Sequence, residues 1–376
     1  MMKYIPYGHQ SITEEDIEAV VETLRSDYLT TGPKVAEFEK AMSDYTGAKY
    51  AAAIANGTAA LHAACMAAGI GEGDEVIVTP NTFVASSNCV LYCKGTPVFA
   101  DIDAETYNIS PKEIRKKITY KTKAIIGVDF SGQPCEWDEI KEIAKEHQLI
   151  LIEDAAHSLG ADYKGMKVGN IADMTTFSFH PVKHITTGEG GMILTNNREY
   201  YEKLLLARSH GITRDANQMA KNDGAWYYEQ FELGYNYRIT DIQCALGVSQ
   251  LKRLDEYVEK RRALAKRYDE AFGEMEDIIT PKQKEGCHNS YHLYVIQVKN
   301  RSRKDVFDAL RQAGIGVNVH YIPVYTQPYY RMHGYEKVSC PHAQEYYNRA
   351  ISLPLYPGLT QEEQDYVIEQ VKKVME

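Results

Sequence analysis

The stretch Leu149-Ile-Leu-Ile-Glu-Asp154-Ala-Ala-His157 decides the fold class. Its four leading apolar residues indicate a strand that is covered on both faces, as in a parallel sheet between two layers of helices. Asp154 follows at the carboxyl end of this strand, where ligands bind in open α/β sheets. A carboxylate in such a place is costly unless it is paired. We therefore interpret Asp154 as either a functional acid or a structural turn residue.

Similar short apolar runs occur before and after this stretch. Strands are expected over 75–79, 97–101, 123–128 and 192–195. Helices are expected between them, over 57–68, 82–93, 111–117 and 136–146. Apolar strands that alternate with amphipathic helices are typical of an α/β fold. The sequence therefore predicts a large, mainly parallel sheet covered by helices.

The last third of the chain has a different texture. A long charged helix is expected over 251–272, then a strand over 291–298, a helix over 303–313, a short strand over 316–320, and closing helices over 341–349 and 360–375. We predict two domains: a large domain over 1–250, which includes an N-terminal segment over 1–45, and a smaller C-terminal α+β domain over 251–376. The N-terminal segment contains an expected helix over 13–25, for which Ser11 and Glu14 would form a capping box.

Composition excludes several classes of protein. The 376 residues include 42 Lys and Arg against 52 Asp and Glu, a net charge of −10, and no dense basic run, so we expect no nucleic-acid partner. The seven cysteines are scattered without a C-x-x-C, which argues against a disulfide framework or a zinc site. The N-terminus lacks the apolar core of a signal peptide, and no run of 18 apolar residues occurs. We expect a cytoplasmic protein that does not contact a membrane.

The run Ala55-Asn-Gly-Thr-Ala-Ala-Leu61 places a turn of small residues directly before a helix. The free amides of Gly57 and Thr58, with the Thr58 hydroxyl, would face an anion at the positive end of that helix. A simple N-cap by Asn56 or Thr58 explains the same residues. This run alone leaves both interpretations open.

A single lysine follows the strand-like run Thr176-Phe-Ser178-Phe, next to a glycine-rich turn. In a pocket, Lys183 would lose proton affinity and become a nucleophile, whereas in a solvated loop it would have no role. The spacing of His157, His180 and His184 matches no usual metal-ligand pattern, so we expect no metal.

These elements together resemble a fold-type-I pyridoxal-phosphate enzyme. Along its whole length the chain resembles the DegT/DnrJ/StrS-type nucleotide-sugar aminotransferases. The stretches that carry this resemblance are Tyr28-Leu-Thr-Thr-Gly-Pro33, Ala55-Asn-Gly-Thr58, Thr79-Pro-Asn-Thr-Phe83, Glu153-Asp-Ala-Ala-His157, Ser178-Phe-His-Pro-Val-Lys183, Arg208-Ser-His-Gly211, Gly234-Tyr-Asn-Tyr-Arg238 and Val319-His-Tyr-Ile-Pro323. The run from Ser178 to Gly191 and the late His-Tyr-Ile-Pro are most similar to the branch that aminates the 4-keto sugar of pseudaminic acid biosynthesis.

The resemblance implies a role for each matching residue. Lys183 would form the Schiff base with pyridoxal 5'-phosphate and move the proton, and Asp154 would pair with the ring nitrogen; these are the two catalytic residues. The other cofactor contacts would be Gly57, Thr58 and Ser178 at the phosphate, Phe83 on the ring face, His157 at the phenolic oxygen, and Asn236 from the neighbouring subunit. The active enzyme would then be a homodimer with shared sites.

By the same matching, the nucleotide-sugar pocket would be lined by Tyr7, Asp27, Tyr28, Leu29, Thr30, His320, Tyr321, Ile322 and Pro323. The implied reaction moves the amino group of L-glutamate to the keto carbon of UDP-4-keto-6-deoxy-N-acetylhexosamine. Two alternatives stay open: a dTDP- or GDP-linked 3-keto or 4-keto sugar, and a regulatory pyridoxal-phosphate binder without turnover. A dehydratase branch of the family carries His at the lysine position, and the gap-free run to Lys183 favours transamination instead.

Overall fold

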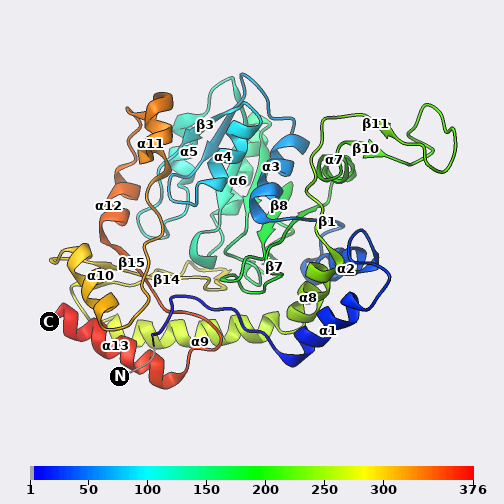
Figure 1. Cartoon of the computed structure of the whole chain (residues 1–376). Coiled ribbons are helices and arrows are strands. Elements are labelled where there is room, and N and C mark those ends of the chain that lie inside the picture. The colour runs from blue at the N-terminus through cyan, green and yellow to red at the C-terminus, as the bar shows by residue number, and fades with distance from the viewer. Residues whose placement is uncertain (1–3) are drawn as a thin grey trace.

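The computed structural model describes residues 4–376 and is built around a seven-stranded sheet (Figure 1). The strands are β1 (Tyr50–Ile54), β2 (Glu75–Val78), β3 (Thr96–Phe99), β4 (Thr122–Val128), β5 (Ile150–Asp154), β8 (Met174–Ser178) and β9 (Gly191–Thr195), in the spatial order β1-β9-β8-β5-β4-β2-β3. Neighbours from β8 to β3 pair in parallel, and β9 runs antiparallel to both of its neighbours. The predicted α/β fold with a large, mainly parallel sheet is confirmed.

Helices cover both faces of this sheet. One face packs against α3 (Gly57–Ala67), α4 (Ala85–Tyr92) and α7 (Arg198–Arg208). The other packs against α2 (Pro33–Thr46), α5 (Pro111–Lys117), α6 (Trp137–His147) and α8 (Asp241–Leu251). Side chains alternate along a strand, so Val76 and Val78 join the first core and Ile77 the second. Gly127 in β4 has no room for a side chain, because an added Cβ would lie 2.6 Å from the Trp137 ring.

The C-terminal part has its own core beside the large sheet. Its helices are α9 (Leu254–Phe272), α10 (Arg303–Gln312), α12 (Pro341–Arg349) and α13 (Gln361–Met375), and its sheet has the order β12 (Ile278–Ile279), β14 (Tyr294–Val298), β15 (Ala350–Leu353). The remaining elements are α1 (Glu14–Leu24), α11 (Pro328–Tyr330), β6 (Asp162–Tyr163), β7 (Met166–Lys167), β10 (Ile212–Thr213), β11 (Glu229–Gln230), β13 (Cys287–His288) and the turns η1 (Phe130–Gly132), η2 (Val324–Thr326) and η3 (Arg331–Tyr335). Among residues 4–376, no helix has the length and apolar character that a membrane span requires.

Three local details differ from the sequence-based expectations or add to them. The capping box of α1 is formed by Thr13 and Asp16 rather than by Ser11 and Glu14, because the helix begins at Glu14 and the Thr13 N–H donates to the Asp16 carboxylate at 3.0 Å. No strand forms over 316–320; that segment makes one isolated bridge, from Asn318 to Ser352. Ile5 packs in the core of the C-terminal part, and the domain boundary near residue 250 stays a prediction.

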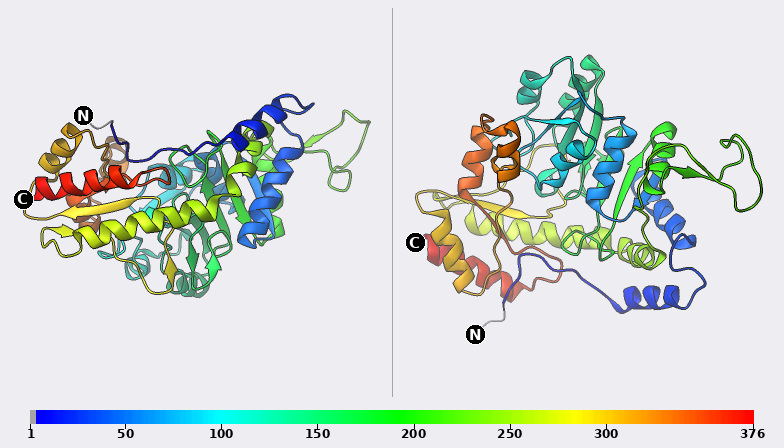
Figure 2. Two further views of the ribbon diagram at one scale, coloured as in Figure 1. Left: turned by 90° about the horizontal axis from the view of Figure 1, so that it is seen from below. Right: turned by 45° about the horizontal axis from the view of Figure 1, so that its top comes forward.

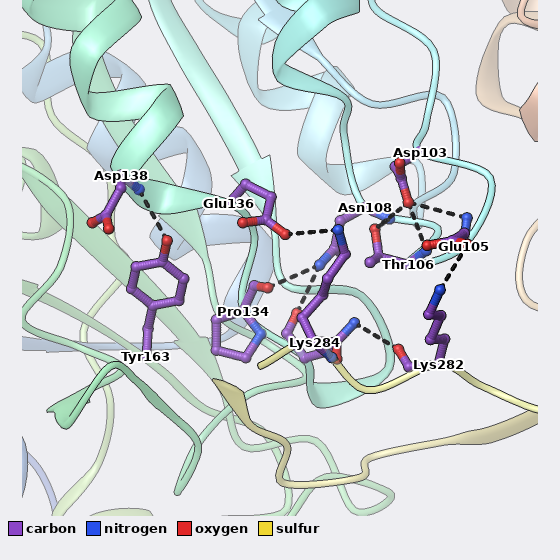
Figure 3. Close-up of polar contacts among 11 residues, drawn as sticks. Asp103, Glu105, Thr106, Asn108, Pro134, Glu136, Asp138, Tyr163, Lys282 and Lys284 are labelled. Carbon is purple, nitrogen blue, oxygen red and sulfur yellow. Dashed lines mark hydrogen bonds and ion pairs between the residues drawn. The ribbon is translucent and has the colours of Figure 1, made fainter. Parts of the chain in front are cut away.

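The segment before β13 joins the C-terminal part to the large sheet (Figure 3). Lys282 reaches Glu105 at 2.7 Å, and Lys284 reaches Glu136 at 3.3 Å. Gln133 adds two bonds to the main chain of the same segment. These contacts lie next to the η1 turn, and they connect the C-terminal part to the loops of the large sheet there.

A hairpin arm extends from the body of the molecule between α7 and α8. It contains the short strands β10 and β11 and projects well beyond the helices around it (Figures 1 and 2). Large apolar side chains are exposed on the arm and just after it: Trp226 is 74% exposed and Leu233 is 79% exposed.

Candidate active site

Asp154 ends β5 and lies among polar side chains of the neighbouring elements. Its Oδ2 accepts a hydrogen bond from the Ser86 hydroxyl at 2.6 Å, and its Oδ1 accepts one from the Ala156 N–H at 3.2 Å. Burial raises the pKa of this carboxyl, while the two donors and the charge of Lys183 act in the opposite direction. Burial of a charged carboxylate is unfavourable, and a cationic partner offsets that free-energy cost.

Lys183 lies in the turn between β8 and β9, with its main-chain N–H bonded to the His180 carbonyl. The pKa of its amine is lowered to about 8, because burial, followed by the positive charge of Arg261, lowers the pKa by more than the Asp154 charge raises it. A lysine with this pKa is partly unprotonated near neutral pH and acts as a nucleophile and a base. This lowered pKa is what the pocket interpretation of Lys183 requires, and the assignment of the residue stays a prediction.

Gly57 and Thr58 open α3 directly beside Ser178 at the end of β8. An added Cβ on Gly57 would lie 2.8 Å from the Ser178 Cβ and 3.1 Å from its hydroxyl oxygen, so glycine is what allows this close approach. The N-cap is Asn56, whose side chain accepts the Ala59 N–H at 2.8 Å. The N-cap and the anion interpretations are thus compatible, because the cap leaves the Gly57 and Thr58 amides free to face an anion.

His157 lies in the loop that follows β5, three residues after Asp154, and is buried. Its Nδ1 accepts the Ser131 N–H at 3.3 Å, and its Nε2 lies 3.1 Å from the Tyr321 hydroxyl. Burial lowers the pKa of His157 far below its usual value, and the nearby charge of Lys183 lowers it further. Phe83, whose side chain is 59% exposed, lies 6.4 Å from the Tyr321 ring between centroids.

Some of the predicted substrate residues gather at this end of the site and others do not. The Tyr7 ring lies 5.5 Å from the His320 ring, and His320 lies 4.8 Å from Tyr321. Pro323 is buried and Ile322 is 45% exposed.

The loop over 27–30 is exposed and lies against the start of α8 instead. Thr30 bridges to Thr240, and the Leu29 carbonyl accepts the Asp241 N–H at 3.0 Å. Asn236 is also exposed within its own chain. Within one chain these residues therefore join other surfaces than the pocket around Lys183.

Sequence reasoning missed three residues that shape the site. Ser86 bonds Asp154, Ser131 bonds His157, and Arg261 lies buried near Lys183, where its Nη1 donates to the Leu355 carbonyl at 2.8 Å. No sequence motif identifies the two serines, because each of them contacts a residue that is distant in the sequence. Arg261 had a weak signal, because it is a charged residue on the buried face of the long helix α9.

The residues present fit pyridoxal phosphate. A nucleophilic amine suits its aldehyde, the Asp154 carboxyl suits a protonated ring nitrogen, and the Gly57 cradle suits its phosphate. Residues 4–376 contain no group of three or more His, Cys, Asp and Glu side chains arranged to hold a metal ion.

Comparisons with known proteins agree with this chemistry. The chain is 42% identical to the spore coat polysaccharide biosynthesis protein SpsC of Bacillus subtilis, over 99% of this chain and 97% of that one. It is 39% identical to the UDP-4-amino-4,6-dideoxy-N-acetyl-beta-L-altrosamine transaminase of Campylobacter jejuni, over 99% and 98%.

Solved structures of aminotransferases also superpose closely on this chain. Helicobacter pylori PseC, an aminotransferase involved in the biosynthesis of pseudoaminic acid, has a TM-score of 0.93 at 33% identity over 99% of both chains. The pyridoxal-phosphate form of the putative sugar aminotransferase Spr1654 of Streptococcus pneumoniae has a TM-score of 0.93 at 34% identity, over 99% of this chain and 98% of that one. Residues 10–372 match the DegT/DnrJ/EryC1/StrS aminotransferase family. The chain belongs to this family and is a sugar aminotransferase that depends on pyridoxal phosphate.

Proposed function

We propose that this chain transfers the amino group of L-glutamate to the ketone of UDP-4-keto-6-deoxy-N-acetylhexosamine, a step of pseudaminic acid biosynthesis. The observation that carries the proposal is that Asp154, at the carboxyl end of β5, and Lys183, in the turn after the parallel strand β8, lie near enough for their charges to affect each other's pKa. The names of the Campylobacter jejuni and Helicobacter pylori relatives support the choice of sugar.

Each residue has a distinct task in this reaction. Bound pyridoxal phosphate supplies a ring that accepts the electrons left behind when a proton leaves carbon. Asp154 holds a proton at the ring nitrogen, and the Lys183 Nζ takes and returns the proton at carbon. The amides of Gly57 and Thr58 and the Ser178 hydroxyl hold the phosphate, and Phe83 covers a face of the ring.

The nucleotide sugar would enter beside Tyr7, His320 and Tyr321, on the His157 side of the pocket. Burial lowers the pKa of His320 to about 3, so this side chain is neutral at physiological pH. A neutral, aromatic-rich wall suits a sugar ring, whose faces are apolar and whose edges form hydrogen bonds. Ile322 and Pro323 extend this wall, and the loop over Asp27–Thr30 would complete it from a second subunit.

The second subunit is part of the proposal. Asn236 is exposed in its own chain. Its neighbours in the sequence, Tyr235 and Tyr237, stack on each other with their ring centroids 5.0 Å apart. The arm that precedes it exposes Trp226 and Leu233 to solvent. A second copy that covers the arm would bury these side chains and carry Asn236 to the phosphate of the neighbouring site.

Mixing two inactive variants tests the shared site. Lys183→Ala and Asn236→Ala chains, mixed and reassembled, are expected to recover about a quarter of wild-type activity, because half of the dimers are mixed and each has one complete site of two. Lys203→Ala, which removes a surface lysine paired with Glu199, is the matched control. A mixture as inactive as its parents would contradict a site shared between subunits.

Absorbance spectra test the chemistry and the substrate. The protein with bound pyridoxal phosphate should show a yellow band that bleaches on addition of L-glutamate, and the keto sugar should restore the band. Lys183→Ala should retain its fold and lose turnover. A band that glutamate leaves unchanged would refute the proposed donor, and an active Lys183→Ala variant would refute the mechanism.

The similarity to SpsC favours a second candidate substrate, another nucleotide-linked keto sugar used in polysaccharide assembly. The same assay decides between them when UDP-, dTDP- and GDP-linked 4-keto and 3-keto sugars are compared. Restoration of the band fastest by a dTDP- or GDP-linked sugar would replace the UDP-sugar assignment.

A further inference from the structure

Ser131 lies in the η1 turn after β4 with φ 62° and ψ 2°. Only a few per cent of residues other than glycine adopt this left-handed conformation. The turn is held on several sides: the Ser131 hydroxyl donates to the Leu293 carbonyl at 2.7 Å, the Phe130 N–H donates to Asn108 Oδ1 at 2.8 Å, and the Ser290 N–H donates to the Gly132 carbonyl at 3.1 Å. These bonds fix the direction of the Ser131 main-chain N–H.

That N–H determines which nitrogen of His157 carries a proton. It donates to Nδ1, so Nδ1 has no hydrogen of its own. The imidazole is neutral, because burial and the Lys183 charge lower its pKa far below neutrality. A neutral imidazole has one N–H, which is therefore on Nε2. The Nε2–H points to the Tyr321 hydroxyl at 3.1 Å, so His157 donates and Tyr321 accepts.

The Tyr321 hydroxyl consequently keeps its own hydrogen for another acceptor. Within residues 4–376, this hydroxyl has its hydrogen-bond contact with His157 alone. Burial raises the pKa of Tyr321, so the hydrogen is retained across the working range of pH. The rings of Phe130 and Phe83 flank Tyr321 at 6.2 and 6.4 Å and limit its movement.

We propose that Ser131, His157 and Tyr321 form a one-way hydrogen-bond relay that presents the Tyr321 hydroxyl hydrogen to an oxygen atom of the bound ligand. That oxygen is either the ring oxygen of pyridoxal phosphate or the ketone oxygen of the sugar. Ser131 is a positioning residue, and it couples the relay to the C-terminal part through Leu293. The position of the ligand rests on the proposed function, whereas the direction of the relay rests on the protein alone.

The direction is tested by nitrogen NMR of protein labelled with ¹⁵N-histidine, with and without pyridoxal phosphate. His157→Gln assigns the signal by its loss. The expected result is a single neutral form with hydrogen on Nε2; hydrogen on Nδ1, a mixture of forms, or a doubly protonated ring at pH 7 would overturn the relay. Ser131→Gly keeps the N–H and should leave this form unchanged, so a changed form would overturn the assignment to the main chain. A failure of the proposed function would leave this readout intact.

The ligand end is tested by substitutions read in two ways. Tyr321→Phe and His157→Leu are each expected to lower kcat/KM about tenfold, which is the effect of one lost hydrogen bond. His157→Gln should recover most of the His157→Leu loss, because glutamine accepts through Oε1 and donates through Nε2. A shifted absorption maximum of the bound cofactor in Tyr321→Phe, without substrates, assigns the acceptor to the cofactor. A higher KM for the sugar at an unchanged maximum assigns it to the ketone, and no change in either would overturn the proposal.

Discussion

Raising the pH through about 8 is expected to speed the covalent attachment of pyridoxal phosphate to Lys183, because the amine attacks only when it is unprotonated. Burial disfavours the charged ammonium and lowers the pKa of this lysine from 10.5 to about 8. The sign is definite: attachment is slow below the pKa, rises about tenfold per pH unit as the pKa is approached, and levels off above it.

The magnitude follows from the size of the shift. At pH 7 about 9% of an amine with a pKa of 8 is unprotonated, against about 0.03% of an ordinary lysine, a ratio of about 300. Asp154→Asn removes the negative charge that raises the Lys183 pKa, so its midpoint should lie below that of the wild type.

The assay mixes cofactor-free protein with pyridoxal phosphate from pH 6 to 10 and follows the yellow band by stopped-flow absorbance. Titration of the free cofactor is common to all variants, and Asp154→Asn also alters the rate through the ring nitrogen, so the pH midpoint of the rate and not its absolute size is compared with that of the wild type. Lys183→Ala gives the background. A wild-type rate that still rises about tenfold between pH 9 and pH 10, or an Asp154→Asn midpoint above the wild-type value, would refute the reasoning.

Three further substitutions test the surroundings of the site. Gly57→Ala places a methyl group 2.8 Å from the Ser178 Cβ, so the affinity for pyridoxal phosphate should fall about tenfold or more while the affinity for pyridoxal, which lacks the phosphate, changes little; equal losses for both in binding titrations would argue against the cradle. Ser86→Ala removes the 2.6 Å bond to Asp154 and should lower the free energy of unfolding by about 1.5–3 kcal/mol, measured by urea denaturation; an unchanged urea midpoint would contradict this. Burial raises the pKa of Glu153 above its usual 4.5, so wild-type stability should fall as pH rises above about 4.5 and Glu153→Gln should be the more stable by a margin that widens with pH; a constant margin between pH 5 and 8 would show that this carboxyl keeps its ordinary pKa.

The sequence was a good guide wherever the controlling interactions are local. Five expected helices and strands around the site begin and end within a few residues of α3, β4, α6, β5 and β9. Their apolar runs and turn residues act over one or two turns of chain, so a short window contains most of the relevant physics. The expected strand over 316–320 was wrong, because this segment pairs with β15 at one position only, Asn318 with Ser352.

The amino-acid sequence alone predicts the order of the residues that carry chemistry and the class of sheet that holds them, with Asp154 at a strand end and Lys183 next to a glycine-rich turn. The contacts among Ser131, His157 and Tyr321 become visible in the folded chain alone. His157 and Tyr321 are 164 positions apart, and Ser131 acts through a main-chain N–H whose left-handed conformation its residue type does not favour. Such contacts depend on the path of the whole backbone. The direction of the Ser131 N–H, for example, is set by segments that are far apart in the sequence and come together when the chain folds.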